Sequence, residues 1–381
     1  MEAIANGIED RLIDGLSFKL APGASYITER KSVTYNCQGS NIYSPTSGNT
    51  LIRFLLTGDQ WADPSTLRIM FDVYNNAASG SGQMLRPLGA PWAFFKRMRV
   101  LAGNGQLVED IDQYARVHQM FHTLTSKHSS INDSAEGFGL DSSNIKDLGD
   151  TTKLVGIAPQ EAQTVMFKPL SGLFTQDKYI PLRYCPITIE LELTDQITDP
   201  VVISGGATTN GFTTGNTSTT WQLQQVQIKL DVCTLDNALD NSYAQHMLSG
   251  NALPINYSTW VSHLQAVTGQ DLNLNITRAL TRLKSVFVTL DKDLPTTGTR
   301  AVWWRRKWND FFSPLSNENS QGALTSLRDG EFDFSIQIGP SRYPIYPIRS
   351  HAEGFYQLKK TLGAQASPLH NFDINGVEYR D

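Results

Sequence analysis

Aromatic rings and cations are interleaved in one short stretch of the sequence, 301-AVWWRRKWNDFF-312. The candidate contact residues of this Trp cluster are Trp303, Trp304, Arg305, Arg306 and Trp308. Such residues can stack on bases while they bind phosphates, or form a cation–π arrangement within a fold. Trp and Arg are also enriched where protein subunits meet. The cluster therefore predicts a contact with nucleic acid, within the fold, or with another subunit.

The charge balance of the chain favours the subunit contact over nucleic acid. The 381 residues include 32 Lys and Arg and 37 Asp and Glu, for a formal net charge of −5. A protein that binds by neutralising phosphates usually has a basic surplus or a basic face. Read as a strand, residues 302–308 place Trp and cations on both faces. We interpret the Trp cluster as an interface with another subunit and expect no sequence-specific binding of nucleic acid.

Catalytic and metal-binding motifs are not found in the sequence. It contains no G-x-S-x-G, Walker, H-E-x-x-H or paired C-x-x-C motif. His118 and His122 are four residues apart with His128 close behind, and that spacing can hold a metal ion. No carboxylate accompanies the pair in the way such motifs need, so we favour a polar flank on a helix. We expect no metal site at these histidines.

Cellular context can be read only from general features. Cys37, Cys185 and Cys233 are widely spaced and odd in number, which predicts folding in a reducing compartment. No apolar run approaches the roughly 18–20 residues of a membrane span. The first residues, MEAIANGIEDRLIDG, do not have the pattern of a secretory signal.

Most of the chain reads as β-strands. Short alternating or β-branched runs recur between Gly, Pro, Asn and Ser clusters, at 31–37, 50–58, 66–74, 94–103, 164–174, 187–195 and 222–235. The alternation is clear where Ile187, Ile189 and Leu191 are separated by polar residues. This pattern predicts antiparallel sheets with one buried and one exposed face.

Three helices are expected, at 109–127, 236–250 and 350–363. In the first, apolar residues recur at three- and four-residue steps through Tyr114, Val117 and Phe121. We expect these three side chains to pack against their own domain. The third helix places Phe355, Leu358 and Leu362 at similar steps, and we expect the same of them.

A strand, a Gly turn, a short return and a helix occur twice, from 96 and again from 331. This repetition predicts two copies of one β-rich domain, each a jelly roll, an eight-stranded sandwich of two sheets. The expected division is an N-terminal arm at 1–30, a first jelly roll at 31–198, a Gly- and Thr-rich linker or loop at 199–220, and the last strand of the first barrel with the second jelly roll at 221–381. Few residues follow the last helix, so we expect either a reduced second barrel or a natural chain that continues past Asp381.

The passage 97-RMRVLAGNGQLVEDIDQYARVHQMFHTL-124 resembles the strand, Gly turn, E-x-I-x-x-Y and helix segment of double jelly-roll major capsid proteins. The stretches 169–195 and 275–291 are similar to that family as well. The lineage includes tectivirus-like, adenovirus-like, virophage and Polinton-like virus shells. The resemblance implies two jelly-roll sandwiches side by side, mainly β with a few short helices, and neither enzymatic activity nor a cofactor.

The resemblance also implies a function and partners. Three chains would form a pseudo-hexagonal capsomer, and capsomers would tile an icosahedral shell around a double-stranded DNA genome. The partners would be two further copies, neighbouring capsomers, and penton and minor capsid proteins. The protein would be made and assembled in the infected host cell and reside in the virion. Two alternatives stay open: a penton or minor capsid protein, and a carbohydrate-binding or carbohydrate-active sandwich in which Trp303 and Trp308 stack on sugars.

Overall fold

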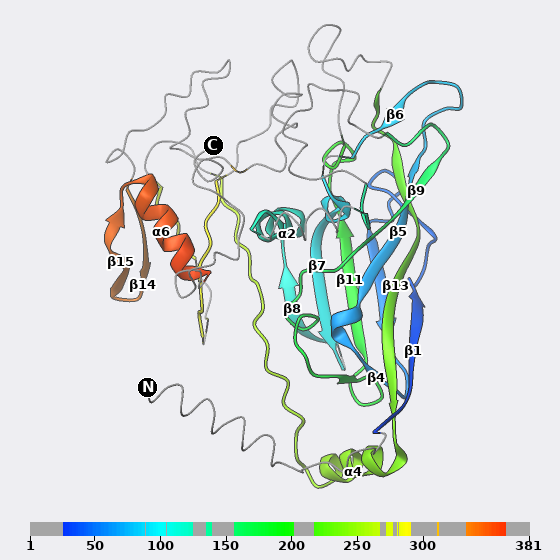
Figure 1. Ribbon diagram of the computed structural model, residues 1–381. Helices are drawn as coiled ribbons and strands as arrows, with labels where there is room; N and C mark the ends of the chain where they lie inside the picture. Colours follow the sequence, from blue (N-terminus) through cyan, green and yellow to red (C-terminus); the bar gives the residue numbers. More distant parts are fainter. Residues whose placement is uncertain are drawn as a thin grey trace, which may run out of the picture.

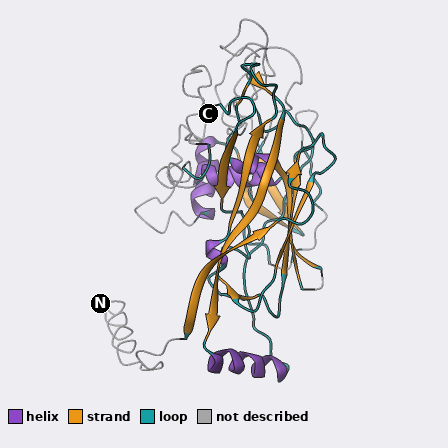
Figure 2. Ribbon diagram, turned by 90° about the vertical axis from the view of Figure 1, so that its right-hand side faces the viewer, coloured by secondary structure: helices purple, strands orange, loops and turns teal. Residues whose placement is uncertain are grey.

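The computed structural model describes residues 26–87, 89–103, 105–124, 135–138, 156–201, 217–266, 272–276, 280, 282–290, 311 and 333–362. This part of the chain is mainly β, with antiparallel sheets and a few short helices (Figures 1 and 2). The predicted fold class of β-sandwich type is therefore confirmed.

The first sheet is built around one long strand, β13 (Trp221–Leu235). Its main strands, in spatial order, are β1 (Ile27–Asn36), β13, β5 (Arg68–Asn75) and β9 (Ala162–Phe167). Short strands extend it: β2 (Ile42–Tyr43), β4 (Trp61–Ala62) and β10 (Ile180–Pro181). All of these pairings are antiparallel.

The second sheet has four strands, in the order β3 (Leu51–Leu56), β11 (Ile187–Leu193), β7 (Phe95–Ala102) and β8 (Gln106–Ile111). The pairings are again antiparallel. On its outer face Glu190 lies between Arg53 and Arg99, at 3.3 and 3.1 Å. These cross-strand ion pairs cover the Glu190 carboxylate, which is 8 % exposed, while Ile189 and Leu191 on either side are buried in the core.

The strand pairing identifies a jelly roll. Taken in chain order, the eight main strands pair as first with last (β1 with β13), second with seventh (β3 with β11), third with sixth (β5 with β9) and fourth with fifth (β7 with β8). The chain is thus one long, nested antiparallel hairpin. Rolling it up adds the contacts of β13 with β5 and of β11 with β7, which gives two four-stranded sheets face to face.

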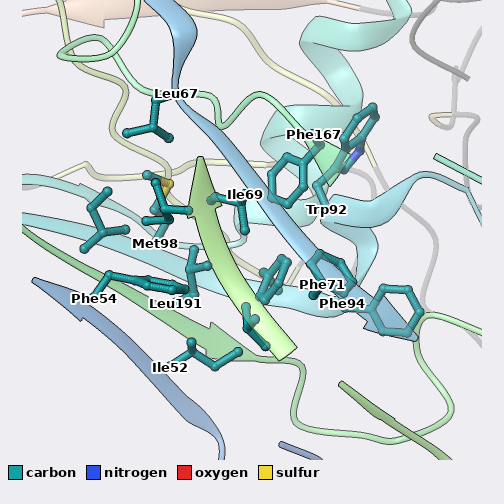
Figure 3. Close-up of a cluster of buried hydrophobic side chains, with 14 of the residues drawn as sticks. Ile52, Phe54, Leu67, Ile69, Phe71, Trp92, Phe94, Met98, Phe167 and Leu191 are labelled. Carbon is teal, nitrogen blue, oxygen red and sulfur yellow. The ribbon is translucent and has the colours of Figure 1, made fainter. Parts of the chain in front are cut away.

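The space between the two sheets is filled by the inward-facing residues of each strand (Figure 3). Ile52 and Phe54 of the second sheet face Ile69 and Phe71 of the first, and all four are fully buried. The Phe71 ring lies edge-on to three others, with centroid distances of 6.3 Å to Phe94, 5.5 Å to Phe95 and 6.3 Å to Phe167. The alternation seen in the sequence therefore marks the core correctly.

Short elements close the ends of the sandwich. They are the 3₁₀ turns η1 (Pro64–Thr66) and η2 (Pro91–Phe94), the parallel pair β6 (Met84–Leu85) and β12 (Thr217–Ser218), and the helices α2 (Tyr114–Thr123) and α4 (Asn237–Leu248). Helix α4 begins at its predicted cap, where the carboxylate of Asp236 accepts a hydrogen bond from the Ala238 amide at 3.1 Å.

The first predicted helix starts later than expected. Residues 109–111 belong to β8, and Gln113 has a left-handed backbone with φ of 49°, so a helix cannot extend back through it. Pairing of β8 with β7 outweighs the helical spacing of the apolar residues here. The predicted start at 109 was wrong, whereas a helix through Tyr114, Val117 and Phe121 is confirmed.

The second strand–turn–strand–helix unit consists of β14 (Phe334–Ile338), β15 (Ser341–Ile348) and α6 (His351–Thr361). Gly339, with φ of 59°, makes its turn as Gly103, with φ of 55°, does in the first unit. The predicted unit therefore occurs twice. Figure 1 shows the second copy beside the first jelly roll, on the side of β8 and α2. None of the residues in these three elements is buried, Phe355 and Leu358 included.

The structure describes only some of the residues in the other predicted parts of the chain. Strand β1 begins at Ile27, and β13 lies at the centre of the first sheet. Of the Gly- and Thr-rich stretch, residues 199–201 and 217–220 are described, and 202–216 lie outside the described residues. The described residues between 251 and 290 form no helix and no named strand. Among the described residues after β13, only β14 and β15 form a sheet, so the second jelly roll stays a prediction.

Candidate functional site: helix α2 and the sheet edge beside it

Helix α2 is fixed to the first jelly roll by its N-terminal half. Tyr114 is fully buried, and its hydroxyl accepts a hydrogen bond from the Leu170 amide at 2.8 Å. Gln119 is also buried and accepts a hydrogen bond from the indole of Trp92 at 3.1 Å. Val117 is half-buried and packs against the core. The predicted packing of Tyr114 and Val117 on their own domain is therefore confirmed.

The two histidines of α2 both lie on Trp92. The His118 ring stacks on the indole with centroids 4.1 Å apart, and the His122 ring is 4.8 Å away and tilted. Burial lowers the pKa of His118 well below its usual range, and the nearby His122 lowers it further. In the described part of the chain, no three potential metal ligands come together. Both rings pack on Trp92, His118 is neutral at pH 7, and His128 lies outside the described residues.

Phe121 makes its ring contacts with the second half of the chain. Its ring centroid is 4.1 Å from that of Trp260 and 5.3 Å from that of Phe287, and the latter two are 6.2 Å apart. The prediction that Phe121 packs against its own domain is corrected, because both of these rings belong to the segment that follows β13 and α4. This aromatic trio joins the first jelly roll to the segment that follows it.

Arg116, one turn before Phe121, lies over the ring of Phe311 at 4.3 Å. This is a cation–π contact between α2 and a residue close in sequence to the Trp cluster. The cluster itself, Trp303, Trp304, Arg305, Arg306 and Trp308, lies outside the described residues. The structure therefore places none of the predicted interface residues, but it brings their sequence neighbour to α2.

The buried carboxylate of Glu109 is a further feature of this region that the sequence patterns did not mark. It lies on β8 with 3 % of its surface exposed. It accepts hydrogen bonds from the Ser171 hydroxyl and from the amides of Gly172, at 2.8 Å, and Leu173, at 3.2 Å. Burial raises the pKa of Glu109, and the three hydrogen bonds oppose that rise. Glu109 thereby ties the loop at 170–174 to the edge of the second sheet.

A small polar pocket at the foot of the sandwich bears on the carbohydrate alternative. It has a volume of about 240 Å³, and Asp59, Trp61, Arg183 and Asp240 are among its lining residues. Trp61 is 8 % exposed, its indole donates to Asp240 at 3.3 Å, and its ring packs on Tyr243 of α4. The indole is buried against α4, so its face is not accessible for stacking on a sugar ring.

Comparison with known proteins adds little to the fold assignment that the strand pairing gives. No family model and no curated protein matches the chain. A chain in the 3.5 Å cryo-EM structure of the Sputnik virophage matches with a TM-score of 0.38 and 9 % identity, over 58 % of this chain and 52 % of that one. This protein therefore covers about half the length of that chain. The fold assignment rests on the nested pairing of the eight strands.

In the part of the chain that the structure describes, no helix is long and apolar enough to cross a membrane.

Phe121→Ala should lower the free energy of unfolding by about 1–3 kcal/mol, less than the loss of a fully buried ring, because Phe121 is half-buried. Chemical denaturation measures this change. Leu107→Ala is the control, since Leu107 is 51 % exposed on the neighbouring strand and should change stability by no more than about 0.5 kcal/mol. Equal effects of the two substitutions would contradict the aromatic contact.

Proposed function

We propose that the protein is a viral major capsid protein with two jelly rolls, three copies of which form a pseudo-hexagonal capsomer. The observation that carries the proposal is the hairpin-and-helix unit of the first jelly roll, β7–β8–α2, which recurs as β14–β15–α6. Jelly rolls by themselves serve many functions. A repeated jelly-roll unit in one chain favours the double jelly-roll capsid class that residues 97–124 resemble. In this proposal capsomers tile an icosahedral shell around a DNA genome.

The proposed organisation follows from the same repetition. The strands from β1 (Ile27–Asn36) to β13 (Trp221–Leu235) form the first jelly roll, with β12 in the stretch between β11 and β13, and the residues after β13 contribute the second. The exposed side chains of the second unit support this arrangement: Tyr343, Ile345 and Tyr346 are 54, 79 and 85 % exposed within the described part of the chain. Large apolar side chains that are so exposed suit surfaces covered in a larger assembly. Its partners are neighbouring capsomers, pentons and minor capsid proteins of the virion, and its role is structural rather than enzymatic.

Light scattering on the purified protein after size-exclusion chromatography tests the proposal. We expect a stable species of three times the mass of the chain. A monomer that binds glycans would replace the capsid proposal with the carbohydrate-binding alternative. A five-fold species would favour a penton protein.

We also propose the Trp cluster as part of the contact between copies, because interface energy concentrates in a few Trp and Arg residues. The contact of its sequence neighbour Phe311 with α2 lies within one chain, and it supports instead the alternative of packing inside the fold. The double substitution Trp304→Ala with Arg306→Ala should weaken trimer association by at least about 2 kcal/mol. Sedimentation of the trimer over a concentration series gives this value.

The same variant distinguishes a subunit contact from phosphate binding. Apolar burial predicts a weak dependence of association on salt, whereas phosphate contacts give a steep log–log dependence. Retention of DNA is measured across a salt series, and the thermal unfolding of the dissociated chain is the folding control. Intact trimers together with lost DNA retention would contradict the interface and favour nucleic-acid binding.

A further inference from the structure

The residues after α4 run along the open edge of the second sheet, beside β8 and α2 (Figure 1). The backbone carbonyl of Pro254 accepts a hydrogen bond from Lys178 Nζ at 3.0 Å, and Ser262 Oγ donates one to the carbonyl of Asp112. Between these points Ile255, Tyr257 and Trp260 are partly buried against the core of the first jelly roll. Residues 254–262, called the clasp below, are thus held at both ends and along one face.

The backbone of the clasp comes close to the sandwich at Gly172. A Cβ atom built on Gly172 would overlap the carbonyl oxygen of Ser258 and lie 2.8 Å from its carbonyl carbon. The backbone of Gly172 is not in the left-handed region, so its φ does not demand glycine. Glycine is required there because any side chain would occupy the space that the clasp fills.

Gly172 cannot easily move away from the clasp. Its amide donates to Glu109 at 2.8 Å, and Glu109 also binds the residues on both sides of it. A Cβ atom on Gly172 would lie 2.9 Å from that same carboxylate. The clasp contributes Tyr257 to this region, where burial raises the pKa of its hydroxyl and the charge of Glu109 adds to the rise. The buried carboxylate, the tight loop and the clasp therefore form one interlocked unit.

The clasp reaches this site from its own chain. Helix α4 is attached to the same sandwich through Trp61, whose indole bonds to Asp240 and whose ring packs on Tyr243. From Leu248, the end of α4, to Pro254 is a short connection that spans at most roughly 20 Å when extended. No exchange of segments between copies is needed to fill the site.

We propose that docking of residues 254–262 on the β8 edge fixes the second half of the chain against the first jelly roll, and that assembly requires this fixed placement. Within the clasp, Trp260 contacts Phe121 of α2 and Phe287, a residue that follows the clasp, so the contact continues along the chain. The docking itself stands on the contacts of the clasp, and its part in assembly rests on the proposed function.

Gly172→Ala in the full chain tests the docking. The added methyl group displaces the clasp, and cleavage by chymotrypsin after Tyr257 and Trp260 should become about tenfold faster, because cleavage follows local opening. Gly58→Ala is the matched control. A Cβ atom at Gly58 would have its nearest neighbours at 3.9 Å, and its φ lies outside the left-handed region, so cleavage should stay at the wild-type rate. Equal cleavage of the three proteins would overturn the proposal.

Further measurements separate the possible outcomes. Near-ultraviolet circular dichroism reports whether the first jelly roll is folded; if Gly172→Ala does not fold, Trp260→Ala removes an anchor without adding bulk and should speed the cleavage after Tyr257. Protection of the clasp that increases with protein concentration would show that it comes from a second copy and overturn same-chain docking. If Gly172→Ala is cleaved fast but still forms normal trimers, the role of the clasp in assembly is overturned and the proposed function stands. If the wild type forms no trimer, the proposed function fails, and the cleavage rates still decide the docking.

Discussion

Glu109→Ala should lower the free energy of unfolding by about 3–5 kcal/mol, because the Ser171 hydroxyl and the amides of Gly172 and Leu173 lose their acceptor inside the fold. The loop at 170–174 would also lose its attachment to β8. Urea unfolding followed by tryptophan fluorescence measures the change. A loss below about 1 kcal/mol would show that water or another group satisfies the three donors.

Glu109→Gln is the matched control for the charge. Its amide oxygen can still accept from Gly172 and Leu173 while its nitrogen donates to Ser171, so we expect a change of about 1 kcal/mol or less. Burial raises the pKa of Glu109 above its ordinary value of 4.5, so the folded state binds the proton more tightly than the unfolded state. The stability that this pKa difference contributes is therefore fully present at pH values below 4.5. It is lost as the pH rises through the higher pKa that Glu109 has in the folded state. The difference in stability between wild type and Glu109→Gln should follow that decline, and a rise with pH would contradict it.

Phe71→Ala should cost about 3–5 kcal/mol of stability, because the ring is fully buried between the two sheets and lies edge-on to Phe94, Phe95 and Phe167. Met70→Ala is the control on the same strand. Met70 is half-buried on the opposite face of β5, and its truncation should cost about 1 kcal/mol or less. Equal losses would contradict the placement of the core between the sheets.

Local patterns predicted much of the first jelly roll. The alternation of Ile187, Ile189 and Leu191 with polar residues corresponds to their burial in β11, because successive side chains of a strand point to opposite faces. The helix caps were also readable: Ser350 and Glu353 form a capping box at the start of α6. The start of α2 could not be predicted from the sequence, because Ile111 and Tyr114 fit a helical spacing. Only the pairing of β8 with β7 makes Ile111 part of a strand.

The partners of particular side chains could not be predicted. A glutamate in a strand normally faces water, and Glu109 is buried because its donors come from a loop far along the chain. Phe121 was correctly assigned to the apolar side of α2, but Trp260 and Phe287 reach it only through the path of the clasp. Whether the Trp cluster joins two copies stays a prediction, since its residues lie outside the described part of the chain.

Cryo-electron microscopy of the purified oligomer tests the central claim most directly. We expect particles of three chains with a six-lobed outline, two sandwiches per chain, and the strand orders β1–β13–β5–β9 and β3–β11–β7–β8 in one sandwich of each pair. Particles with one sandwich per chain, or isolated single chains at the concentrations used for imaging, would contradict it.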